Sequence, residues 1–222
     1  SVPSTMLIGA AADALAHQSP AQAEKLVRAS PNADRDARAN LMLAQSLVFQ
    51  GRAADAGRYF DSALSSAADD ETIAQAAIAA STADALSLQD FPSGLSRLQQ
   101  ARERVTEVTA VDALDAQKGL LLLFVAGSDE AMSAVRPVVE RSVESGDDAL
   151  MLALCVATAV SAWAGRTTDA LRYASRASAI VERRPNLTLI EVASVFHMKA
   201  YALYTSGRYT DAVAVNTEAH DR

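Results

Sequence analysis

The sequence contains few side chains whose types and spacing could perform catalysis. Its three histidines, His17, His197 and His220, form no His-Glu-x-x-His motif and lie at no zinc-binding spacing from Cys155, the single cysteine. Cys155 stands in an apolar stretch, which favours a buried structural thiol over a nucleophile. Neither a Gly-x-Ser-x-Gly motif nor a phosphate-binding Gly-x4-Gly-Lys-Ser/Thr loop is present. We therefore expect no catalytic residue, no metal site and no cofactor, and a protein that is not an enzyme.

The acidic pairs of the sequence are explained by helix ends. Asp69-Asp70 and Asp147-Asp148 each stand where a predicted helix begins. A helix N-terminus carries partial positive charge, so carboxylates are stabilising there. These pairs are therefore predicted to be first-turn residues and not the paired carboxylates of an acid–base mechanism.

Composition favours helices and excludes some partners. Half of the 222 residues are hydrophobic, only 5% are aromatic, and there are nine glycines and six prolines, too few for a loop-rich or all-β fold. The formal net charge is −7 and the basic residues are scattered, so we expect no nucleic-acid contact by this segment. The longest uncharged run, Ala149–Gly165, is weakly hydrophobic and is predicted to be a buried helix, so no membrane partner is expected. A single cysteine and no visible signal peptide favour the cytoplasm.

An internal repeat organises the whole chain. The motif Gly-Arg-x-x-Asp-Ala occurs three times, at Gly51–Ala56, Gly165–Ala170 and Gly207–Ala212. Degenerate copies begin at positions 18, 89 and 126, which gives successive intervals of 33, 38, 37, 39 and 42 residues. Repeats of this length are typical of stacked helical units, because each unit buries its apolar face against its neighbours.

The motif itself predicts a helix, a tight turn and a second helix. Glycine supplies the left-handed residue that ends a helix, and the aspartate then falls in the first turn of the next one. Apolar residues flank each turn at steps of three and four, as in Leu43, Leu47, Ala56 and Phe60. The predicted fold is all-α, a right-handed α-solenoid of about six helical hairpins that forms a single domain over residues 1–222.

This pattern resembles the tetratricopeptide repeat. Aligned on the turn glycine, Ala44, Ala56, Phe60 and Ala63 occupy the small-residue and phenylalanine positions of that family. The early Trp and Tyr of the family consensus are absent, and the period is longer than the usual ~34 residues. The peptide-clamp residues of well-known tetratricopeptide domains therefore cannot be assigned here.

A narrower resemblance is to the helical sensor region of large ATP-binding LuxR-family transcription regulators, which include the maltose regulator. It is carried by irregular Ala-rich hairpins with Gly-Arg-x-x-Asp-Ala turns, in segments such as Leu120–Gly127 and Ala162–Arg166. The resemblance implies that an ATPase module and a helix-turn-helix module lie elsewhere in the full-length chain. Because the sequence begins without Met and stops in or just after the last predicted helix, we expect it to be a fragment of a larger protein.

A binding surface is expected where the first helices of the hairpins line the concave face. Residues about ten, six and two positions before each turn share one stripe of their helix. Aromatic side chains with a few polar partners gather on these stripes, which is typical of a ligand pocket, although aromatic residues beside a turn can instead pack against the next repeat. The candidate ligand-binding residues are Gln45, Phe49, Gln117, Phe124, Trp163, His197, Tyr201 and Tyr204.

Two functions are compatible with this surface. The first is the sensor domain of a LuxR-type regulator, which binds a small effector such as a sugar, or a regulatory protein. The alternative is a tetratricopeptide scaffold that binds a peptide or helix of a partner protein. A compound that raises the melting temperature would favour the first function, and peptide capture without any small-molecule effect would favour the second.

Overall fold

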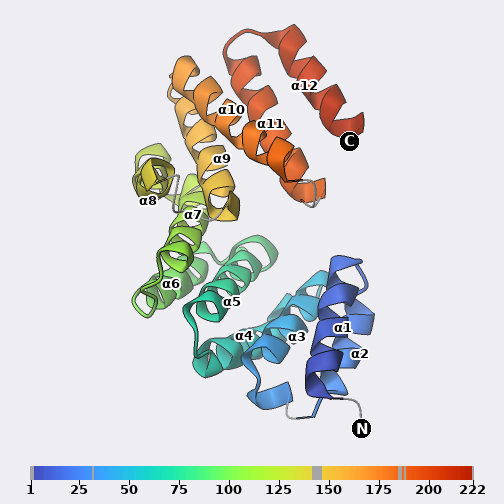
Figure 1. The fold of residues 1–222 in the computed structure, drawn as a ribbon. Coiled ribbons are helices and arrows are strands. Elements are labelled where there is room, and N and C mark those ends of the chain that lie inside the picture. Colours follow the sequence, from blue (N-terminus) through green and yellow to red (C-terminus); the bar gives the residue numbers. More distant parts are fainter. Residues whose placement is uncertain (1–2, 32, 142–146, 185–186, 188, 222) are drawn as a thin grey trace. The chain divides into compact units, whose positions relative to one another are not determined.

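The computed structural model describes residues 3–31, 33–141, 147–184, 187 and 189–221, and these residues form helices and no strand (Figure 1). The helices are α1 (Ser4–Ala16), α2 (Pro20–Arg28), α3 (Ala37–Phe49), α4 (Ala53–Ser66), α5 (Asp70–Thr82), α6 (Phe91–Arg102), α7 (Val108–Val125), α8 (Ser128–Arg141), α9 (Asp147–Trp163), α10 (Thr167–Arg183), α11 (Leu189–Thr205) and α12 (Tyr209–Asp221). A 3₁₀ turn, Ala33–Arg35, precedes α3, and a π-helical turn, Ala83–Ser87, extends α5.

Consecutive helices pack as hairpins. α1 packs on α2, α3 on α4, α5 on α6, α9 on α10, and α11 on α12. α7 and α8 approach each other where Gly119 meets Val135. The first helices of neighbouring hairpins also touch, α1 on α3, α3 on α5, and α9 on α11. The described residues therefore form the predicted six hairpins, and within each unit neighbouring hairpins stack on one another.

The chain divides into two compact units, Ser1–Leu114 and Asp115–Arg222, and the boundary falls within α7. We call these unit 1 and unit 2. Unit 1 contains α1 to α6 and unit 2 contains α8 to α12. That residues 1–222 act as a single domain stays a prediction.

Left-handed backbone marks the turn of every hairpin. Positive φ values occur at Gln18 (54°), Gly51 (75°), Gln89 (57°), Gly127 (107°), Gly165 (68°) and Gly207 (79°). These positions are separated by 33, 38, 38, 38 and 42 residues. The sequence pattern places the fourth turn at Ala126, which is wrong by one residue, because the turn needs its left-handed residue at Gly127.

The turns close with a common hydrogen bond. In the hairpin of α3 and α4, the N–H of Arg52 donates to the carbonyl of Leu47 at 2.8 Å. The N–H of Arg166 donates to Ser161 at 2.8 Å in the hairpin of α9 and α10. This bond from just beyond the helix back to its last turn satisfies a carbonyl that the helix leaves unpaired.

The aspartate of the motif lies in the first turn of the second helix, as predicted. Asp55 accepts from Arg52 at 3.0 Å, and Asp211 accepts from Arg208 at 2.7 Å, so the motif's arginine and aspartate pair with each other. In the copy at Gly165–Ala170, Asp169 pairs with Arg172 at 2.9 Å instead. The arginine of that copy, Arg166, is therefore in a different environment from its counterparts.

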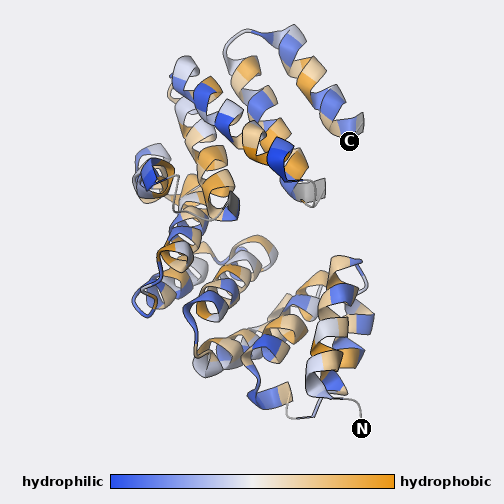
Figure 2. Ribbon diagram, viewed as in Figure 1, coloured by the Kyte–Doolittle hydropathy of each residue, from blue (hydrophilic) through white to orange (hydrophobic). Residues whose placement is uncertain are grey.

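Small residues let the helices approach closely. In unit 1, Ala44, Ala56 and Ala63 are buried together with Phe60 in one apolar cluster, as their tetratricopeptide-like positions predict. In unit 2 the largest fully buried side chains include Leu121, Leu154, Val135 and Ile180. Figure 2 shows that α9 is mainly hydrophobic, whereas α10 carries hydrophilic segments between its apolar residues. The first helix of this hairpin is therefore covered by neighbouring helices and the second is amphipathic.

The acidic pairs lie at helix starts. Asp69 caps α5, where its carboxylate accepts the N–H of Thr72 at 2.8 Å. Asp148 lies in the first turn of α9 and pairs with Arg184, which follows the last residue of α10. Asp69, Asp70 and Asp148 therefore lie at helix starts, as predicted, while the side chain of Asp147 lies outside the described residues.

Candidate ligand-binding site

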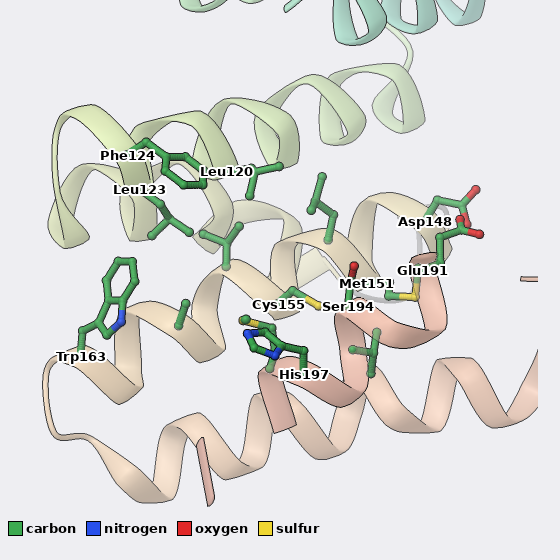
Figure 3. A pocket seen from close by; sticks show the side chains of 15 residues that line it. Leu120, Leu123, Phe124, Asp148, Met151, Cys155, Trp163, Glu191, Ser194 and His197 are labelled. Carbon is green, nitrogen blue, oxygen red and sulfur yellow. The ribbon is translucent and has the colours of Figure 1, made fainter. Parts of the chain in front are cut away.

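Unit 2 contains a pocket of about 540 Å³ between α7, α9 and α11 (Figure 3). α9 contributes the largest share of its wall. Its lining is almost entirely apolar, so a bound group would be held mainly by burial of nonpolar surface. The lining residues are Leu120, Leu123, Phe124, Asp148, Met151, Leu152, Cys155, Val156, Ala159, Trp163, Glu191, Ser194, Val195, His197 and Met198.

Helical spacing explains why these residues share one pocket. Side chains four residues apart lie on the same face of a helix. Leu120 and Phe124 on α7 have this spacing, as do Cys155, Ala159 and Trp163 on α9. Asp148 and Trp163 lie fifteen residues apart on α9, so the pocket runs for about 22 Å along the helix at 1.5 Å per residue.

One end of the pocket is aromatic. Phe124 keeps 61% of its surface exposed and Trp163 keeps 51%. Figure 3 shows both at the same end of the pocket, one from α7 and one from α9. Both side chains therefore keep more than half of their surface accessible. Exposed aromatic side chains beside an apolar pocket are characteristic of binding surfaces.

The opposite end is acidic. Figure 3 shows the carboxyl groups of Asp148 and Glu191 near each other, at the end remote from Trp163. Asp148 also pairs with Arg184, and its side chain remains largely exposed. The pocket therefore has an apolar body with an aromatic end and a charged end.

Two further groups line the middle of the pocket. Cys155 contributes its partly exposed side chain to the wall, and its apolar surroundings raise the pKa of the thiol to about 12. The thiol is therefore protonated at neutral pH, which supports the expected structural role over a nucleophilic one. His197 lies on α11 with an exposed side chain. It is the only polar residue of the predicted stripe on that helix that reaches the lining.

The remaining predicted residues lie elsewhere. Gln45 and Phe49 line a separate pocket of about 740 Å³ in unit 1, between α3 and α5. Phe49 is 71% exposed there. Gln117 is buried within α7. Three of the eight predicted residues, Phe124, Trp163 and His197, are therefore brought together in the unit 2 pocket.

The two predicted tyrosines of α11 diverge. Tyr201 is half-buried and packs against Ala162, Ala170 and Ala202. Tyr204 is exposed and meets the ring of Tyr209 edge-on, with 5.3 Å between centroids and 64° between planes. Tyr201 lies four residues after His197, so the spacing predicts that both side chains face the same way. The packing of neighbouring helices determines which side of α11 faces the pocket, and only His197 lines it.

Several lining residues were not among those predicted. Leu123, Met151, Asp148, Glu191, Ser194 and Met198 all belong to this group. Leu123 lies one residue before Phe124, and Met151 lies four residues before Cys155. A wider stripe on each helix would therefore have included both residues.

Among the described residues, no group of three or more His, Cys, Asp or Glu side chains is placed to hold a metal ion. No described helix has both the length and the hydropathy of a membrane-spanning segment.

Comparison with known proteins shows the fold. The protein is similar to PilW, a widely conserved type IV pilus biogenesis factor, with a TM-score of 0.68 and 16% identity over 95% of this chain and 90% of that one. It is also similar to a tetratricopeptide repeat protein from Parabacteroides merdae ATCC 43184, with a TM-score of 0.63 and 15% identity over 98% and 79% of the two chains. No protein-family model and no curated protein matches the sequence.

These similarities define a class of fold. The protein is an all-helical α-solenoid of tetratricopeptide-like hairpins, as the sequence pattern predicts. Neither structural neighbour is described as a transcription regulator, so the LuxR-family context stays a prediction.

Proposed function

We propose that this protein is a protein-interaction scaffold, and that the pocket of unit 2 binds an apolar segment of a partner protein. The observation that carries the proposal is the pair of exposed rings, Phe124 and Trp163, at one end of an apolar pocket of about 540 Å³. Large aromatic side chains at an apolar surface commonly supply most of the binding energy of an interface. The tetratricopeptide-like fold supports the same class of function.

The dimensions of the pocket describe the segment. A pocket of about 22 Å accommodates about four turns of helix or six to seven extended residues. Bulky aliphatic side chains of the partner would lie along Leu120, Cys155 and Ala159, where the wall is apolar. Arg184 already pairs with Asp148, so this end of the pocket does not select the charge of the partner. The expected partner is therefore an apolar segment.

A small effector is the second candidate, and the pocket volume favours it. Small-molecule pockets commonly measure about 300–1,000 Å³, a range that includes this one. A sugar, however, requires many hydrogen-bond partners, and the middle of this wall offers few polar groups beyond Ser194 and His197. If the protein is the sensor of a LuxR-type regulator, the effector that fits this pocket is a hydrophobic compound.

The test uses peptides selected from a random display library against the full chain. Their affinities are then measured for the wild-type protein and for Trp163→Ala and Phe124→Ala. Each substitution is expected to weaken binding about 30-fold, the equivalent of about 2 kcal/mol at an interface hot spot. Tyr204→Ala is the matched control, because it removes an exposed aromatic residue near the end of α11 that lies outside the pocket.

A second measurement locates the binding site. Trp163 is the only tryptophan and lines the pocket, so bound peptide should shift the fluorescence emission of the wild-type protein. Peptides that bind all three variants with the wild-type affinity and leave the tryptophan emission of the wild type unchanged would show that the pocket is not the interface. Retained helical circular dichroism in each variant ensures that lost binding does not reflect unfolding.

A further inference from the structure

Unit 2 contains a second, smaller pocket of about 280 Å³ between α8, α9 and α10. Its lining is chemically unlike that of the apolar pocket. Two arginines, Arg136 and Arg166, reach it from α8 and from the start of α10, and Ser161 and Tyr173 add hydroxyl groups. This combination of donors is typical of a site for an oxyanion.

Ser161 is unusual among the buried hydroxyl residues. It is 1% exposed, and its Oγ has no hydrogen-bond partner in the described protein. Other buried serines and threonines in these helices donate to the carbonyl four residues earlier, such as Thr158 to Leu154 at 2.7 Å and Ser178 to Ala174 at 3.0 Å. A buried hydroxyl without a partner is unfavourable, so a partner is expected from a group that enters this pocket.

Both guanidinium groups are available for a ligand. Neither Arg136 nor Arg166 forms an ion pair within the described part of the chain. Arg166 is the motif arginine of its repeat, and its counterparts Arg52 and Arg208 pair with the aspartate three residues later. In this repeat the aspartate, Asp169, pairs with Arg172 at 2.9 Å. Among the three copies of the motif, only the copy at Gly165–Ala170 has an arginine that forms no ion pair with a carboxylate of the described residues.

A related pocket in unit 1 has its arginines already engaged. Tyr59 lines it and lies eight residues after Gly51, as Tyr173 lies eight residues after Gly165. There Arg28 pairs with Glu24 at 2.8 Å, and Arg58 donates to the hydroxyl of Tyr59 at 2.9 Å. Burial acts to raise the pKa of Tyr59, but Arg28 and Arg58 together lower it below its ordinary value. The tyrosine position is shared, and only the unit 2 pocket retains two arginines without ion-pair partners.

We propose that the pocket of Arg136, Arg166 and Ser161 binds the phosphate or carboxylate group of a small compound. The guanidinium groups, one from α8 and one from the start of α10, would neutralise the oxyanion, and Ser161 would donate its hydroxyl hydrogen. The N-terminus of α10, which begins at Thr167, adds the positive end of a helix of seventeen residues. Glu140 and Asp169 also line the pocket, and their carboxylates oppose a ligand with a second negative group. This site lies apart from the peptide pocket and does not depend on it.

The test measures the thermal stability and the affinity of the full chain with inorganic phosphate and with acetate, against chloride at equal ionic strength. Phosphate is expected to raise Tm, because a ligand that binds only the folded state stabilises it. Arg136→Gln and Arg166→Gln should each weaken phosphate binding about tenfold or more, since each removes charge-assisted hydrogen bonds. Arg208→Gln, which changes the same turn position in another repeat, should bind phosphate like the wild type.

Two further variants are expected to change the response to phosphate in opposite directions. Glu140→Gln removes a repulsive charge and should tighten phosphate binding. Ser161→Ala should raise Tm in chloride, because it removes the unpaired hydroxyl, and should reduce the additional rise caused by phosphate. If acetate rather than phosphate gives the arginine-dependent rise, the oxyanion is a carboxylate and the site stands. The proposal is overturned if neither anion exceeds chloride, or if both arginine variants keep the full wild-type response.

Discussion

Two of the six hairpin turns place glutamine where the others place glycine. Gln18 and Gln89 have φ values of 54° and 57°, in the left-handed region that costs a residue with a side chain roughly 1–2 kcal/mol. At Gly51, where φ is 75°, a β-carbon would meet no atom within 4 Å. A substitution at Gly51 therefore tests backbone strain alone, because an added side chain causes no steric clash there.

Gln89→Gly is expected to raise the free energy of unfolding by about 1 kcal/mol, and Gly51→Ala to lower it by about the same amount. Urea denaturation of the full chain measures both effects. Gly57→Ala is the control, because Gly57 lies inside α4, also with open space around it, and alanine there should stabilise by about 1 kcal/mol. Equal effects of the alanine substitutions at Gly51 and Gly57 would contradict this account of the turns.

The sequence predicts the turns better than it predicts the binding surface. Glycine at the turn and the repeat interval identify five left-handed positions by residue number, including both glutamines, and misplace the sixth by one residue at Ala126. Phe124 and Trp163 follow from their distance to the turn, since the end of the first helix is exposed in this hairpin geometry. Gln117 is buried because other helices pack over it. The spacing of residues along one helix cannot predict that packing.

At the scale of elements, a carboxylate in one hairpin caps a helix of the next. Asp70, at the start of α5, accepts hydrogen bonds from the N–H groups of Thr106 at 2.7 Å and Glu107 at 2.8 Å, just before α7 begins at Val108. The Thr106 hydroxyl adds a third bond at 3.2 Å. The backbone hydrogen bonds from Thr106 and Glu107 lower the pKa of Asp70 below its ordinary value. The sequence explains Asp70 only as a residue of its own first turn, because the second role requires the stacking of hairpins.

The lowered pKa of Asp70 predicts a dependence of stability on pH. A carboxyl group with a lower pKa in the folded state contributes stability above its unfolded pKa of about 3.9, and loses that contribution as pH falls through the folded value. Asp70→Asn should therefore be less stable than the wild type at pH 7, and the difference should shrink as the pH falls below about 4. Urea midpoints across this range measure it.

The control for this prediction is Asp34→Asn, which removes an exposed acid from the 3₁₀ turn before α3. Its difference from the wild type should change much less over the same pH range. A difference between Asp70→Asn and the wild type that stays constant down to pH 2 would show that the capping bonds do not depend on the charge of Asp70.

At the scale of the whole molecule, each unit has its own pocket along the first helices of its hairpins. The unit 1 pocket is lined in part by the amides of Gln45 and Gln75, whereas the unit 2 pocket is nearly all apolar between its ends. The repeat interval of 38 residues continues from Gln89 through Gly127 to Gly165, across the boundary between the units. For this reason the sequence predicts one domain, and only the distribution of contacts distinguishes the two units.

The independence of the units can be tested at Gly119, where α7 meets Val135 of α8. A β-carbon there would lie 2.3 Å from Cγ1 of Val135, a fully buried side chain. Gly119→Ala is therefore expected to destabilise unit 2 by about 1–3 kcal/mol through overpacking, although alanine is the better helix former. Val135→Ala in the same chain removes the clashing methyl groups, so the double variant should lose less stability than the sum of the single substitutions.

Hydrogen exchange of the Gly119→Ala variant then shows how far the destabilisation spreads. Repeat proteins transmit stability mainly between neighbouring units, so amides of α8 and α9 should lose protection while those of α3 and α4 keep the wild-type rates. Exchange that accelerates equally in all four helices would instead show that residues 1–222 unfold as one cooperative domain. Because the substitution lies beyond the boundary at Leu114, the slowest amides of α3 decide between these outcomes.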